Sequence, residues 1–161
     1  MSFDDRLKQA IVRGQKRSEF LAREAAAKAW SEEEYRRQHS QTRLTLSEHI
    51  ESCLSRLPNY FPGFQYETMY GDRGWGGACF RDDLEFVRGV RTTNYSRLEV
   101  TIRPYSSLHV LDLAAKGTIR NKEAYNRNYF EELAHADQQK FSNLIDAWVL
   151  EYAEMYAART A

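Results

Sequence analysis

The chain of 161 residues is poor in cysteine, proline and glycine, with 2, 3 and 8 of them respectively. Cys53 and Cys79 are too few for a disulfide framework, and their separation matches no zinc-binding pattern. We therefore expect two reduced thiols, as in a cytoplasmic protein. The motifs HxxxH, HExxH and CxxC are also absent, so we predict no metal site and no cofactor.

Net charge is a second property that the chain lacks. Its 23 Lys and Arg residues balance its 23 Asp and Glu residues. A free-standing nucleic-acid-binding protein usually carries a clear basic excess, so this balance argues against nucleic acid as a partner. No run approaches the ~18 apolar residues of a membrane span, and the first ten residues lack the apolar core of a signal peptide. We therefore expect a cytoplasmic protein that does not associate with a membrane.

Motifs for catalysis are missing as well. No serine or cysteine stands in a nucleophile motif such as GxSxG. The glycine-rich segment Gly71–Gly77 resembles a phosphate loop, but a strand-like segment follows it and the required lysine is absent, so we interpret it as a hairpin loop. His109, within a predicted strand, would be a general base only with a partner motif that the sequence does not supply. We predict no catalytic residue and favour a non-enzymatic protein.

The clearest pattern that is present is the alternation over residues 95–115, which is typical of an antiparallel hairpin. Leu98, Val100 and Ile102 alternate with polar residues, and Pro104 ends the first strand because it has no backbone donor. A loop of two or four residues predicts one register with a single buried face. In that register Leu98 pairs with Leu113, Val100 with Leu111, and Ile102 with His109.

The opposite face of this hairpin is polar. The same register sets Glu99 opposite Asp112, with Arg97 as the nearest cation. Carboxylates at such a face could hold a divalent cation, but interleaved arginines would repel it. Tyrosines beside the arginines could stack on single-stranded nucleic acid, against which the neutral net charge argues. We interpret Arg97, Glu99 and Asp112 as part of a protein-interaction surface.

Weaker patterns complete the outline. Apolar spacing and capping boxes predict helices over Asp4–Trp30, from Ser31 and over Thr45–Leu57, with a linker at His39–Arg43.

The segments after residue 63 are mostly strand-like. Strands are predicted at Phe64–Tyr70, Ala78–Phe80, Leu84–Val90 and Thr118–Arg120. Turns are predicted at Arg91–Asn94 and Lys116–Gly117, and a short helix is predicted from Asn128. The turn at 91–94 aligns either Val87 or Phe86 with Val100. Asp137 is the predicted N-cap of an amphipathic C-terminal helix of about twenty residues.

These elements predict an α+β fold: N-terminal helices, an antiparallel β-meander of four to six strands, and a long C-terminal helix packed on one sheet face. Residues 1–161 are expected to form a single domain, of which 1–43 is a helical N-terminal arm.

The arm requires a partner surface, because an isolated helix is marginally stable in water. Leu7, Ile11 and Leu21 share one stripe at helical spacing. Residues 1–43 hold ten basic and seven acidic side chains, whereas residues 123–161 hold three basic and seven acidic ones. This asymmetry favours contact between the arm and the C-terminal helix, within one chain or across a homodimer. We therefore predict a protein-interaction module that binds another protein or itself through the arm or the polar sheet face.

The alternative is a small-molecule-binding protein or enzyme with a pocket between the sheet and the C-terminal helix. Aromatic rings of Trp148, Tyr152 and Tyr156 would line that pocket, with His109 and Arg103 as polar anchors. A cavity of roughly 300 Å³ or more would favour this alternative, and a filled interface would favour the interaction module.

Overall fold

The structure is a computed structural model that describes the backbone of residues 2–160 and the side chains of residues 2–26 and 32–159. The chain divides into two compact units, Met1–Arg37 and Gln38–Ala161. Helix α1 (Phe3–Leu54) begins in the first unit and ends in the second. Over its described residues the first unit consists of this helix alone.

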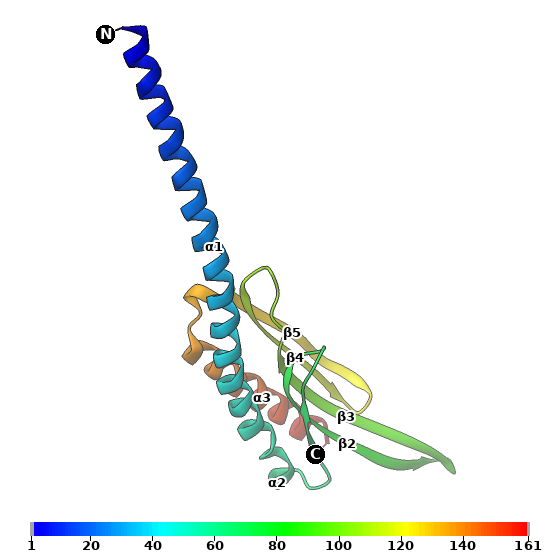
Figure 1. Ribbon diagram of the computed structural model, residues 1–161. Helices are drawn as coiled ribbons and strands as arrows, with labels where there is room; N and C mark the ends of the chain where they lie inside the picture. The colour runs from blue at the N-terminus through cyan, green and yellow to red at the C-terminus, as the bar shows by residue number, and fades with distance from the viewer. Residues whose placement is uncertain (1, 161) are drawn as a thin grey trace. The chain divides into compact units, whose positions relative to one another are not determined.

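The second unit contains a five-stranded antiparallel sheet in the order β1-β2-β3-β4-β5 (Figure 1). The strands are β1 (Gln65–Met69), β2 (Trp75–Val87), β3 (Val90–Ile102), β4 (Val110–Ile119) and β5 (Lys122–Glu132). A short helix α2 (Leu57–Tyr60) precedes the sheet, and a 3₁₀ turn η1 (Leu133–His135) and helix α3 (Gln138–Thr160) follow it. This order confirms the predicted α+β meander with a C-terminal helix.

The core lies between one face of the sheet and the helices of this unit. Its fully buried members include residues of β3 and β4 (Leu98, Val100, Ile102, Leu111 and Leu113), of α1 (Leu46, Ile50 and Leu54) and of α3 (Phe141, Ile145 and Tyr152). The predicted buried face of the central hairpin is therefore confirmed, and so is the packing of the C-terminal helix on the sheet. Asp137 caps α3 as predicted, since its Oδ1 accepts hydrogen bonds from the backbone N–H groups of Gln139 (3.1 Å) and Lys140 (3.3 Å).

The predicted register between β3 and β4 is wrong by four residues. The structure pairs Leu98 with Gly117, Val100 with Ala115 and Ile102 with Leu113. The connection is longer than a tight turn, because residues 103–109 form a loop and β4 begins only at Val110. His109 lies in this loop with a φ of 55°, and not inside a strand. An even shift keeps every side chain on its own face, so the buried set survives the error.

The turn between β2 and β3 lies at Arg88–Gly89 and not at Arg91–Asn94. Both turn residues have positive φ, 54° and 78°, as in the two-residue turns whose twist matches that of the flanking strands. Residues 91–94 therefore belong to β3. Gly77 is the partner of Val100 in β2, which corrects the predicted alignment of Val87 or Phe86 with that residue.

The predicted turn at Lys116–Gly117 and the predicted helix from Asn128 are also wrong, since these residues lie in β4 and β5. A bulge follows Gly117, and the chain turns at Arg120–Asn121, where φ is 49° and 70°. The Asn121 side chain donates to the Thr93 carbonyl oxygen (2.7 Å) and accepts from the backbone N–H of Tyr95 (2.9 Å). These bonds to β3 fix the turn at this position.

Helix α1 is continuous where the sequence predicts breaks at Ser31 and at His39–Arg43. His39 is buried, and its Nε2 lies 3.2 Å from the Arg103 carbonyl oxygen, so this turn of helix is anchored and not a solvated linker. The Thr45 hydroxyl donates back to the Gln41 carbonyl oxygen (3.3 Å) and does not cap a new helix. The side chain of the predicted cap Ser31 lies outside the described residues.

The first part of the glycine-rich segment Gly71–Gly77, up to Gly74, belongs to the connection from β1 to β2, which confirms the hairpin-loop interpretation for that part, whereas Trp75, Gly76 and Gly77 already lie in β2. Gly71 and Gly74 have φ of 114° and 123°, a conformation that side chains rarely permit. Trp75 opens β2, and the guanidinium of Arg43 lies 3.7 Å from the centre of its ring. The indole is thus held by the α1 segment of the second unit.

We expect Leu111→Ala to lower the free energy of unfolding by about 2–4 kcal/mol, because its side chain is fully buried and truncation leaves a cavity. Val100→Ala is expected to fall in the same range. Leu108→Ala is the control: this side chain is 77% exposed in the preceding loop, so its loss should stay below about 0.5 kcal/mol. Urea unfolding followed by circular dichroism measures all three, and equal losses at 108 and 111 would contradict the burial of β4.

Candidate functional site

The predicted arm stripe is present on the helix of the first unit. Leu7, Ile11 and Leu21 are all exposed, and so are Phe3 and Phe20. No side chain among the described residues 2–26 is buried. The first unit therefore presents large apolar groups to solvent along one helix, which is unusual for a surface element without a partner.

The predicted polar sheet face carries a network of ion pairs. Arg97 contacts Glu67 (2.9 Å) and Glu99 (3.4 Å), which confirms it as the cation beside Glu99. Glu99 pairs across the strands with Lys116 and not with Asp112, so the predicted juxtaposition of two carboxylates is wrong. Asp112 accepts instead from the Asn128 amide and lies 3.6 Å from Arg103. These charges are largely satisfied within the sheet.

A second exposed apolar surface lies at the tip of the β2–β3 hairpin. β1 pairs with β2 only as far as Phe80, β4 pairs with β3 only from Arg97, and the Asn121 side chain reaches β3 at Thr93, so residues 84–92 form a two-stranded ribbon beyond these contacts. Figure 1 shows this hairpin projecting from the rest of the sheet. Its exposed apolar side chains are Leu84, Phe86, Val87 and Val90. The sequence analysis missed this surface because it placed the turn at residues 91–94.

The aromatic residues predicted to line a pocket fill the space beneath α3 instead. Tyr152 is buried and donates a hydrogen bond to the Thr118 carbonyl oxygen (2.8 Å). The carbonyl oxygen of the buried Trp148 accepts from the Tyr125 hydroxyl (2.8 Å). The ring of Tyr156 lies 4.9 Å from those of both Phe61 and Phe64. These three predicted residues are thus brought together as core, and burial raises the pKa values of the tyrosine hydroxyls.

His109 and Arg103, the predicted polar anchors, lie in the loop between β3 and β4. The backbone N–H of His109 donates to the Ser106 carbonyl oxygen (3.2 Å), and its own carbonyl oxygen accepts from Leu133 (2.8 Å). Its ring packs against that of Tyr105 at 6.1 Å. Neither residue shares a cavity with the aromatic residues of α3 among the cavities described for residues 38–159.

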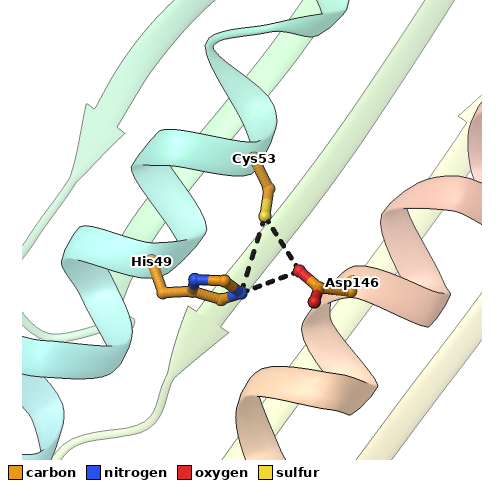
Figure 2. Close-up of side chains that lie close together, drawn as sticks. All are labelled: His49, Cys53 and Asp146. Atoms are coloured by element: carbon orange, nitrogen blue, oxygen red, sulfur yellow. Dashed lines mark hydrogen bonds and ion pairs between the residues drawn. The ribbon is translucent and has the colours of Figure 1, made fainter.

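A cluster of chemically active side chains joins α1 to α3. His49 and Cys53 lie one helical turn apart on α1, and Asp146 faces them from α3 (Figure 2). Asp146 Oδ1 lies 2.8 Å from His49 Nε2 and accepts a hydrogen bond from the Cys53 thiol at 3.3 Å. The remaining edge, from Cys53 Sγ to His49 Nε2, measures 3.7 Å. All three side chains are partly accessible to solvent.

This cluster is not a nucleophilic triad. In a Cys-His-Asp triad the imidazole stands between the thiol and the carboxylate and uses a different nitrogen for each. Here the thiol and the carboxylate meet the same nitrogen, Nε2 of His49. Desolvation, with the hydrogen bond to Asp146, raises the pKa of Cys53 to about 11, so its thiol is protonated at neutral pH. A protonated thiol is a poor nucleophile.

An apolar groove opens beside the cluster, between the end of α1, α2 and α3. Its volume is about 630 Å³. Cys53 and Asp146 form part of its wall, together with Arg56, Leu57, Tyr60, Phe61, Val149, Leu150 and Ala153. The groove lies within the helical layer and not beneath α3, where the sequence analysis placed a pocket.

Sequence analysis missed this cluster, although part of its signal was visible. His49 and Cys53 are four residues apart, a spacing that sets two ligand-type side chains on one helix face. The chain has no HxxxH or CxxC pattern, and the pair forms a mixed HxxxC pattern instead. Asp146 stands 93 residues after Cys53, so its place in the cluster follows only from the packing of α3 beside α1.

No family model matches the chain, and comparisons with curated proteins and with solved structures find no similar protein. Within the described residues, no helix has both the length and the apolarity that a membrane span requires.

Proposed function

We propose that the protein is a non-enzymatic cytoplasmic interaction module that self-associates through its N-terminal arm. The observation that carries the proposal is the exposed apolar stripe of Leu7, Ile11 and Leu21 on a helix of the first unit. Packing, and not intrinsic propensity, supplies most of the stability of helices in proteins. A stripe of this kind is expected to be covered in the functional state.

The filled layer beneath α3 supports this proposal over a ligand-binding protein. Phe141, Ile145 and Tyr152 are fully buried there, and the Tyr152 hydroxyl has its hydrogen-bond partner in β4. Among the described cavities of the second unit, one reaches both the sheet and α3, at Ile119 and Arg159 near the end of that helix, and none is lined by Trp148, Tyr152 or Tyr156. A pocket for a small molecule at the predicted place would require that these side chains move.

The partner that fits the arm best is a second copy of the arm in antiparallel orientation. If Ile11 lies opposite Leu21 of the second copy, then Leu7 lies opposite Ala25 and Gly14 opposite Ser18. In this register two large side chains meet at Ile11–Leu21, and a large one meets a small one at Leu7–Ala25. The small residues Gly14 and Ser18 allow the two helix backbones to approach closely. The stripe supplies the attraction, because each exposed charge pair adds only about 0–1 kcal/mol.

Charge selects the antiparallel orientation. Residues 6–17 hold five basic side chains and no acidic one. A parallel pair would set these segments side by side and place like charges in contact. The antiparallel register sets Lys8 near Glu24 and Arg13 near Glu19, so unlike charges meet.

We expect the full chain to sediment as a dimer and the variant Leu7→Glu/Ile11→Glu to sediment as a monomer, because two carboxylates would be buried in the arm interface. The control Gln9→Glu/Lys16→Gln changes the net charge by the same amount on the opposite face of the helix and should remain dimeric. Sedimentation velocity over a concentration series, with circular dichroism to verify folding, measures this. A monomeric full chain, or equal behaviour of the two variants, would refute the proposed function.

A further inference from the structure

We propose that His49, Cys53 and Asp146 form a binding site for one divalent transition-metal ion of the Zn²⁺ type, held between α1 and α3. The three ligand atoms are an imidazole nitrogen, a thiol sulfur and a carboxylate oxygen, and all lie within 4.8 Å of one another. This site goes beyond the interaction function and stands independently of it, because every ligand belongs to the second unit.

The distances between the ligand atoms are close to those of a tetrahedral site. With bond lengths of about 2.0–2.3 Å, a tetrahedral zinc ion sets its ligand atoms about 3.4–3.6 Å apart. The Cys53–His49 and Cys53–Asp146 separations of 3.7 and 3.3 Å lie within about 0.1 Å of that range. Only the His49–Asp146 separation of 2.8 Å is short, by about 0.6 Å, because these two groups are hydrogen-bonded to each other. A small rotation of two partly exposed side chains would admit the ion.

The chemistry of the ligands selects the class of metal. Ca²⁺ and Mg²⁺ prefer sets of six or more oxygen ligands, whereas this cluster offers one carboxylate. Thiolate and imidazole favour Zn²⁺ and its neighbours in the first transition row. The bound ion would displace the thiol proton of Cys53, as metal coordination does in zinc proteins.

The fourth coordination position would face the groove. Cys53 and Asp146 stand in the groove wall, so an ion bound to them is reached by solvent from a space of about 630 Å³. Three protein ligands with one open position differ from the closed four-ligand sites that serve structure alone. The Arg56 side chain of the same wall adds positive charge, so an anion or a hydroxide is favoured as the fourth ligand.

Cobalt(II) titration of the metal-free full chain tests the proposal, because a bound thiolate gives a sulfur-to-cobalt charge-transfer band. We expect the band to saturate at one equivalent. Cys53→Ser should abolish the band, and His49→Gln or Asp146→Asn should weaken binding at least tenfold. His135→Gln is the matched control, since this exposed histidine lies in η1 and outside the cluster. A band of equal intensity in the Cys53→Ser protein would overturn the proposal.

A second measurement keeps the test decisive if a variant fails to fold. Zn²⁺ added to the unaltered chain should slow alkylation of Cys53, read by peptide mass spectrometry, and should raise the melting temperature by linkage. Mg²⁺ at the same concentration should do neither. The proposal fails if Zn²⁺ leaves the alkylation rate of Cys53 unchanged.

Discussion

Phe141→Ala is expected to lower the free energy of unfolding by about 3–5 kcal/mol, one of the two largest losses anticipated for single substitutions in this chain. The side chain has no exposed surface, and its ring meets that of Tyr129 edge-on with centres 5.3 Å apart. It lies in the first turn of α3, where the N-cap Asp137 fixes the helix start. Truncation therefore leaves a cavity at the point where α3 enters the core.

Leu150→Ala provides the control for this experiment, because Leu150 lies on the same helix and is 68% exposed. Its loss should stay within about 0.5 kcal/mol. Chemical unfolding followed by tryptophan fluorescence and by circular dichroism reports both values. If Phe141→Ala costs less than about 1 kcal/mol, α3 does not pack on the sheet as described.

Alternation of apolar residues was sufficient to place the central sheet face but not its register. Leu98, Val100 and Ile102 in β3 can meet any of the apolar residues at 111, 113 and 115 in β4, so shifts by two or four residues bury equally good sets. The loop over residues 103–109 decides the register, and His109 at its end has a positive φ of 55°. Non-glycine residues adopt this conformation only a few per cent of the time, so no local pattern predicts a loop that ends in this way.

The predicted helix boundaries within α1 are wrong for a related reason. A Thr-x-x-Glu pattern begins at Thr45, yet the helix does not start there because the residues before it are already helical. A capping box indicates where a helix can start, whereas tertiary packing decides whether the residues before it are helical as well. The burial of His39 against the loop that holds Arg103 supplies that packing. This contact spans 64 residues of sequence and was not visible to a local pattern.

Local sequence patterns also predict only part of the candidate site, because its members are far apart in the sequence. A pair of ligand-type residues at i and i+4 is a local feature, so the sequence alone predicts that His49 and Cys53 share one helix face. Their partner Asp146 is one of several acidic residues in the C-terminal helix, and nothing in the sequence distinguishes it from Glu151 or Glu154. Glu151 is engaged elsewhere, in an ion pair with Arg127. The fold therefore assigns the third member of the cluster.

Gly76→Ala is expected to lower the free energy of unfolding by about 3 kcal/mol or more, because the added methyl group has no space. A Cβ at this position would lie 2.0 Å from the Val100 carbonyl oxygen and 3.0 Å from the Thr101 Cα. Both obstacles are backbone atoms of β3, so a side-chain rotation cannot relieve the overlap. Glycine inside a strand often marks such a close approach of two backbones. Low soluble yield, or an early transition in urea, would be the measured result.

Gly14→Ala is the matched substitution, since an added Cβ there meets no atom within 4 Å. In the single chain, where the arm helix is exposed, the substitution removes the backbone entropy cost of glycine, so at protein concentrations below those of self-association it should raise helix stability by about 1 kcal/mol. The two variants thus carry the same chemical change with opposite expected signs. Circular dichroism of both proteins over a urea series separates them. If Gly76→Ala unfolds within about 1 kcal/mol of the unaltered chain, β2 does not approach β3 as closely as described, and the pairing of Gly76 with Thr101 would have to be revised.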